Sequence, residues 1–119
     1  MNEPDPLLLA VFLGLGLLLS GLAVPLIRRR VPPNRWYGFR VPKTLGSPAV
    51  WYPANAHAGW GLLWVGVAVT LTALGGYFGR LADGPYAVLV AAVSSLGLLV
   101  AVARSFAFLS KLPDRDAGA

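Results

Sequence analysis

Residues 28–55 read RRRVPPNRWYGFRVPKTLGSPAVWYPAN and separate two long runs of apolar residues. This loop contains six Lys and Arg side chains and no Asp or Glu, and aromatic residues lie between the basic ones. A flexible connector has no need for so many large amphipathic rings, which usually bury one side against a surface. We therefore expect the loop to fold and to carry the function of the chain.

The sequence on both sides of the loop is typical of a membrane protein. Hydrophobic residues make up 56% of only 119 residues, which is more than the core of a soluble domain of this size can bury. Residues 1–5 lack the positive charge of a secretory signal, so we expect the first apolar run to stay in the chain as a helix.

Three apolar runs are long enough to cross about 30 Å of hydrocarbon as helices. They are residues 6–27, 56–79 and about 85–109. The predicted fold class is therefore an all-α integral membrane protein, with three transmembrane helices in a single domain (1–119).

The positions of the basic residues predict the orientation of the chain, because short loops rich in Lys and Arg stay in the cytoplasm. Six basic residues lie in the loop, and Arg104, Lys111 and Arg115 surround the end of the third run. Arg80 is the only basic residue between the second and third runs. We expect the N-terminus outside the cell, and the loop and the tail (110–119) in the cytoplasm.

The same asymmetry explains the net charge of +5, which by itself would also suit nucleic-acid binding. A basic residue near an anionic membrane surface gains about 1 kcal/mol from the headgroups. We therefore predict that Arg28, Arg29 and Arg30 contact lipid headgroups, and we expect no nucleic-acid partner.

Proline and glycine predict the backbone of the first half of the loop. The pair Pro32-Pro33 ends any extension of the first helix, because proline lacks the N–H donor. Gly38 lies between Tyr37 and Phe39, where a residue without a side chain permits either a positive φ or the close approach of another backbone. We expect the chain to turn at both places.

The second half of the loop predicts a short helix at the membrane interface. Ser47 suits the N-cap and Pro48 the first helical position, so the helix would run through Tyr52. Pro53 is expected to interrupt it, and Asn55 to cap the following membrane helix. The aromatic rings fit an interfacial belt and a folded, ligand-binding cap equally well.

Residues 33–45, PNRWYGFRVPKTL, followed by Ser47, Val50-Trp51 and Asn55, resemble the signature of the SdpI/YfhL family of bacterial membrane immunity proteins. Longer members have a further N-terminal half, so the chain resembles a short three-helix form. The resemblance implies protection of the bacterial inner (plasma) membrane against a membrane-active toxic peptide, and capture of a cytoplasmic regulator in the founding member. These are binding roles, so we expect no enzymatic activity and no cofactor.

The candidate binding residues are the signature positions of this loop. They are Asn34, Trp36, Gly38, Arg40, Pro42, Thr44, Leu45, Trp51 and Asn55. Gly38 and Pro42 suit roles in the backbone. Asn34 and Thr44 suit hydrogen bonds within the loop. The Arg40 guanidinium can either hold a phosphate or carboxylate through two parallel hydrogen bonds or brace the loop.

His57 is the only histidine and lies in the first turn of the second predicted membrane helix. We expect it to be a polar group at the membrane boundary. The sequence contains no cysteine, and no second histidine or carboxylate stands near His57 at ligand spacing, so no metal site is expected.

Small residues recur at four-residue spacing and mark ridges where helices can approach closely. They are Gly75 and Gly79; Ala87, Ala91 and Ser95; and Gly97, Ala101 and Ser105. A homo-oligomer and internal packing of the three helices both remain open. The alternatives to an immunity function are a small lipid-binding structural protein and, with no charge in the middle of a span, less readily a transporter or channel component.

Overall fold

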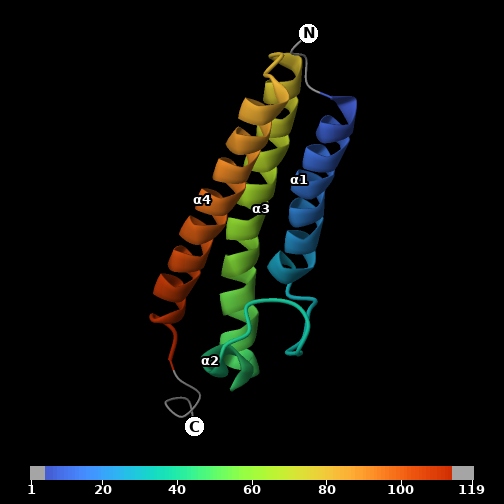
Figure 1. Cartoon of the computed structure of the whole chain (residues 1–119). Helices are drawn as coiled ribbons and strands as arrows, with labels where there is room; N and C mark the ends of the chain where they lie inside the picture. The colour runs from blue at the N-terminus through green and yellow to red at the C-terminus, as the bar shows by residue number, and fades with distance from the viewer. Residues whose placement is uncertain (1–4, 114–119) are drawn as a thin grey trace.

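The computed structural model describes residues 5–113, which form four α-helices joined by turns and one long loop (Figure 1). The helices are α1 (Pro6–Ile27), α2 (Pro42–Leu45), α3 (Pro48–Phe78) and α4 (Asp83–Leu109). Helices α1, α3 and α4 are each long and apolar enough to cross a membrane. The predicted all-helical architecture with three spanning helices is confirmed for these residues. Arg115 and the rest of the predicted tail beyond residue 113 lie outside them.

Two helices begin at a capping side chain followed by proline, and the start at Ser47 and Pro48 was predicted. The Asp5 carboxylate accepts a hydrogen bond from the N–H of Leu7 at 2.9 Å, and Pro6 opens α1. The Ser47 hydroxyl accepts the N–H of Ala49 at 3.1 Å, and Pro48 opens α3. Proline suits this first position because its missing N–H would have had no partner there.

The predicted break at Pro53 is wrong, because α3 runs without interruption from Pro48 to Phe78. A proline inside a helix costs about 3 kcal/mol. Residues on both sides of Pro53 are buried in the continuous helix, Trp51 before it and Ala54 after it, and this burial offsets the cost. Asn55 consequently caps no helix; it lies within α3 and its side chain is turned toward the loop. The four-residue helix α2 was not predicted either.

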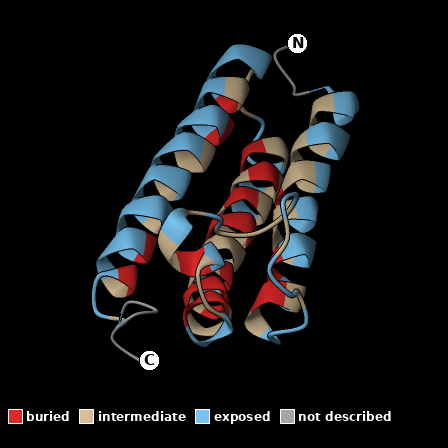
Figure 2. Cartoon of the chain, turned by 90° about the horizontal axis from the view of Figure 1, so that it is seen from below, coloured by how far each residue is buried: buried red, intermediate tan, exposed pale blue. Residues whose placement is uncertain are grey.

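Helix α3 lies between α1 and α4 (Figure 1), and it contains most of the buried residues. Figure 2 shows these along α3, whereas the outer faces of α1 and α4 are exposed. Such exposed apolar faces are what a membrane helix presents to lipid.

Helices α1 and α3 cross closely through small residues. A Cβ atom added to Gly16 would lie 2.7 Å from the backbone nitrogen of Thr70, and one added to Gly66 would lie 2.7 Å from the backbone nitrogen of Ser20. These distances are too short for a carbon atom, so both positions require glycine. Neither glycine belongs to the ridges singled out in the sequence.

Of the ridges that were singled out on α4, one packs inside the molecule. Gly97 faces Val65, Ala101 faces Gly61, and Ser105 is buried. The other ridge is largely exposed at Ala91 and Ser95. Internal packing therefore accounts for the Gly97 ridge, and the homo-oligomer stays a prediction.

Helices α1 and α4 meet at the end of the molecule that carries the turn at residues 79–82, here named the hairpin end. Phe12 and Tyr86 make an edge-to-face contact with ring centroids 4.9 Å apart, and the N–H of Asp5 donates to the Asp83 carboxylate at 3.0 Å. The Tyr86 hydroxyl donates to the carbonyl of Ala73 at 2.6 Å. Toward the opposite end, named the loop end, α1 and α4 diverge and residues 28–47 cover the space below them (Figure 1).

Candidate functional site

The loop between α1 and α3 is fastened to the first turns of α3 by two buried side chains. Trp51 is 0% exposed, and its indole N–H donates to the carbonyl of Val31 at 2.7 Å. Asn55 is 2% exposed; its Oδ1 accepts the N–H of Phe39 at 2.5 Å and its Nδ2 faces the carbonyl of Phe39 at 3.3 Å. One amide therefore holds both polar groups of a single loop residue, which fixes the path of the loop.

Gly38 fits against these two side chains. Its φ of 112° belongs to the region that favours glycine. A Cβ atom at this position would lie 2.6 Å from Asn55 Oδ1 and 3.4 Å from the ring of Trp51. The predicted positive φ is confirmed, whereas the close approach is made by two side chains and not by another backbone.

Helix α2 ties the loop to itself and to the end of α4. Thr44 is 0% exposed; its hydroxyl accepts the N–H of Val41 at 3.0 Å and donates to the carbonyl of Phe39 at 2.8 Å. The Lys43 ammonium donates to the carbonyl of Leu109 at 2.9 Å, in the last turn of α4. A cation there also interacts favourably with the negative end of the helix dipole.

Asn34 organises the turn before Gly38. Its Oδ1 accepts the N–H groups of Trp36 and Tyr37, each at 2.8 Å, and its Nδ2 donates to the carbonyl of Pro32 at 2.7 Å. Such side-chain bonds to nearby backbone are typical of asparagine in turns. The predicted hydrogen-bonding roles of Asn34 and Thr44 are confirmed.

The remaining signature residues face outward. Trp36 is 86% exposed, and Pro42 and Leu45 are exposed as well. The guanidinium of Arg40 donates to the carbonyl of Arg35, so it does brace the loop, but the side chain remains exposed. With five N–H donors, Arg40 can make this bond and still offer others. The signature thus divides into residues that fold the loop and residues that form its outer face.

The basic cluster of Arg28, Arg29 and Arg30 directly follows α1 and is exposed. Arg29 has a φ of 57°, so the backbone turns sharply where the helix ends. All three cations lie at the negative end of the α1 dipole, and nothing among residues 5–113 covers them.

A groove of about 520 Å³, named the α1–α4 groove, opens where these two helices diverge. One wall is formed by Leu22 and Leu26 of α1 and the other by Val102 and Phe106 of α4. The floor is formed by Ala58 and Leu62 of α3. Four residues of the loop also line the groove: Tyr37, Gly38, Phe39 and Val41. The rings of Phe39 and Phe106 are in edge-to-face contact at 5.0 Å, so the loop touches α4 at the groove. The sequence signature therefore lies at an apolar groove that sequence reasoning did not foresee.

Tyr37 joins the loop to the α1 wall of this groove. Its hydroxyl donates to the carbonyl of Leu22. Burial raises the pKa of the Tyr37 phenol above its usual range, so the group stays protonated and keeps this donor at neutral pH.

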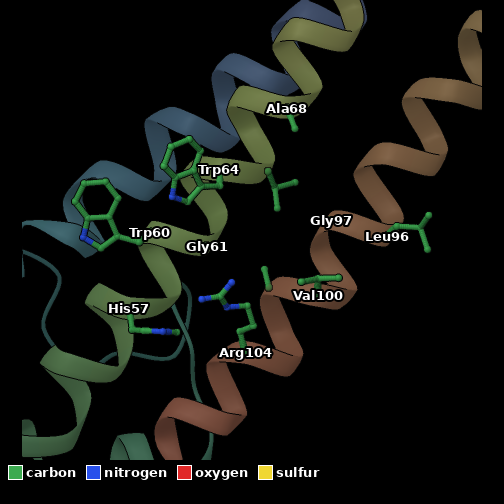
Figure 3. Close-up of a pocket in the computed structure, with 11 residues that line it drawn as sticks. His57, Trp60, Gly61, Trp64, Ala68, Leu96, Gly97, Val100 and Arg104 are labelled. Carbon is green, nitrogen blue, oxygen red and sulfur yellow. The ribbon is translucent and has the colours of Figure 1, made fainter.

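A second hollow of about 500 Å³, named the α3–α4 hollow, lies between α3 and α4 (Figure 3) and shares Ala101 with the lining of the α1–α4 groove. His57 and Arg104 point into the space between the two helices. The His57 ring stacks on Phe108 with centroids 4.2 Å apart, and its Nδ1 is buried without a hydrogen-bond partner among residues 5–113. Within those residues no three His, Asp or Glu side chains are grouped so that they could share a metal ion.

Comparison with known proteins gives one match. A sequence model of the SdpI/YfhL protein family matches residues 30–108, which include the loop from Arg30 onward and helices α2 and α3. No curated protein and no solved structure matches the chain.

Proposed function

Because the chain belongs to the SdpI/YfhL protein family, we propose that it is a multi-pass immunity protein of the bacterial plasma membrane that binds a membrane-active toxic peptide. The observation that carries this proposal is the position of the signature loop. Trp51 and Asn55 fasten the loop to α3 so that its residues 37–39 line the α1–α4 groove. A ligand in the groove would touch the signature directly.

The α1–α4 groove suits an apolar segment of such a peptide. Helices associate in a bilayer through close packing and not through exclusion of water. A segment lying in the groove would contact α1, α3 and α4 at once, whereas on an outer face it would contact one helix. The groove therefore favours a bound peptide over one dispersed in the lipid.

Phe39 offers a route from the groove to the other side of the loop. Its ring lines the groove and contacts Phe106, while its backbone is held by Asn55 and Thr44. We propose that peptide binding shifts this ring and thereby the outer face formed by Trp36, Arg40 and Leu45. This face, with its exposed aromatic, apolar and cationic groups, is where we propose that a cytoplasmic regulator docks.

The basic cluster Arg28–Arg30 would keep this face near the membrane. All three side chains are exposed at the end of α1, where anionic headgroups of the cytoplasmic leaflet attract them. This contact is diffuse and does not require one ligand geometry.

The test is survival of a sensitive bacterium challenged with a panel of secreted apolar membrane-permeabilising peptides. Cells that express the chain should survive at least one peptide that kills cells with an empty vector. Ala58→Phe fills the floor of the groove and should lower survival about tenfold or more, since a bound segment loses its packing against α3. Leu71→Phe places the same aromatic ring on the exposed face of α3 and should protect like the unchanged chain.

Membrane levels of each variant, measured by immunoblot, must match for the comparison. Equal protection by Ala58→Phe and the unchanged chain would remove the groove from the mechanism, and survival equal to the empty vector for every peptide would contradict the immunity function. Trp36→Ala and Arg40→Ala should preserve protection while losing recruitment of a soluble protein to the membrane in the presence of peptide.

A further inference from the structure

The α3–α4 hollow combines a charged end with an apolar remainder. His57, Trp60 and Arg104 line it toward the loop end, and Trp64, Ala68 and Leu96 line it toward the middle of the helices. From His57 to Ala68, α3 rises about 16 Å at about 1.5 Å per residue. This matches half of a hydrocarbon layer of about 30 Å, which is the depth of one leaflet.

Arg104 has no carboxylate partner among residues 5–113. The acidic residues of this range are Asp5 and Asp83, and both lie at the hairpin end, where the N–H of Asp5 donates to Asp83. The exposed guanidinium of Arg104 points into a hollow at the opposite end, where it can hold an anion from outside the chain.

Two neighbours of Arg104 extend its capacity for an anion. His57 lines the hollow beside Arg104, and the stacking of its ring on Phe108 fixes the plane of the imidazole; its Nδ1 is buried and has no hydrogen-bond partner within residues 5–113. Trp60 lines the same part of the hollow with a half-exposed indole, the amphipathic ring that settles at headgroup level in membranes.

We propose that the α3–α4 hollow binds one anionic phospholipid from the leaflet at the loop end, with its phosphate on Arg104 beside His57 and Trp60 and one acyl chain along Trp64 toward Ala68. Arginine matches a phosphate through two parallel hydrogen bonds, which a dispersed contact with the membrane surface does not require. The site differs from the basic cluster Arg28–Arg30, and it shares only Ala101 with the lining of the α1–α4 groove.

The test is native mass spectrometry of the full chain, delipidated in detergent and titrated with phosphatidylglycerol or phosphatidylcholine of identical acyl chains. We expect one phosphatidylglycerol to bind about tenfold more tightly than phosphatidylcholine. Arg104→Gln should abolish this preference. Arg35→Gln removes the same charge from the exposed loop and should preserve it.

The proposed contact between the hollow and an acyl chain is tested by Val100→Trp, which fills the hollow. The control is Val88→Trp, on an exposed face of α4. Only Val100→Trp should weaken phosphatidylglycerol binding, and inorganic phosphate at the same concentration as the lipid should not displace it. The proposal is overturned if both lipids bind equally, if Arg35→Gln and Arg104→Gln reduce binding alike, or if inorganic phosphate competes fully. Displacement of the lipid by an apolar peptide with a free carboxyl terminus would instead assign the hollow to peptides.

Discussion

At the scale of single residues, Asn55 fixes the loop in the way a neighbouring strand would. It pairs with both the N–H and the carbonyl of Phe39, and its Nδ2 also donates to the carbonyl of Trp51. Burying an amide lowers the stability of the fold little when its hydrogen bonds are made, whereas a buried polar group without a partner lowers it by about 1–3 kcal/mol. The loop therefore adopts this one path because only this path satisfies the side-chain amide of Asn55.

Gly38→Ala should destabilise the loop strongly. The methyl group would strain a backbone with φ of 112° and push Asn55 Oδ1 from its bond to Phe39. We expect a loss of about 2–4 kcal/mol, measured by thermal unfolding in detergent micelles, and faster tryptic cleavage after Arg35 and Arg40.

Gly14→Ala is the control for this prediction, because an added Cβ at Gly14 meets no atom within 4 Å. It should be neutral or slightly stabilising, since alanine favours a helix more than glycine does. Equal stability of the Gly38→Ala variant and the unchanged chain would show that the loop does not depend on this close approach.

Residue chemistry predicted several of these local features but not their partners. The positive φ of Gly38 and the cap at Ser47 depend on the chemistry of these residues alone, so both could be predicted from the sequence. Asn55 was expected to cap a helix because asparagine often does so and Pro53 stands just before it. Its actual partner, Phe39, is 16 residues away, and such a pairing depends on how the loop folds back.

At the scale of elements, the apolar runs predicted the membrane helices better than the helix within the loop. Residues 6–27 were assigned correctly as α1, because an uncharged run has few alternatives in lipid. The start of α3 at Pro48 was predicted, but its continuation through Pro53 into the membrane helix was missed, because proline inside a helix usually ends or kinks it and the burial of Trp51 and Ala54 could not be foreseen. The α1–α3 crossing was missed because Gly16 and Gly66 are small residues among many in uniformly apolar helices.

Gly16→Ala should separate α1 from α3. The new Cβ would collide with the backbone of Thr70, which belongs to a helix and cannot move aside alone. We expect a loss of about 1–3 kcal/mol in thermal unfolding, typical of overpacking.

The matched variant Gly21→Ala lies on the same helix, and its added Cβ meets no atom within 4 Å. It should unfold at the temperature of the unchanged chain or slightly above. A similar loss for both variants would point to helix propensity or lipid contact as the cause instead of the crossing.

At the scale of the whole molecule, the three spanning helices form an open arrangement and not a closed bundle. Helices α1 and α4 touch near Phe12 and Tyr86 and then diverge, which leaves space for the α1–α4 groove. The number of helices could be predicted from hydropathy alone. Which helices meet could not, because lipid and protein neighbours are equally apolar and the decisive contacts are between a few small residues.

The orientation predicted from the basic residues can be tested directly, because the chain contains no cysteine. Arg80→Cys at the hairpin end should react with a membrane-impermeant maleimide in intact cells. Arg35→Cys on the exposed loop should react only after the membrane is opened. Labelling of the loop position in intact cells would reverse the topology and place the signature outside.

The hydrogen bond from Lys43 to the carbonyl of Leu109 joins residues 66 positions apart and has a consequence for biosynthesis. Residues 28–47 leave the ribosome well before α4, so they can settle on α3 early while this bond still lacks its acceptor. The loop can make all of its contacts only after the last helix has been inserted. A loop with every contact formed is therefore present only in a fully assembled membrane domain.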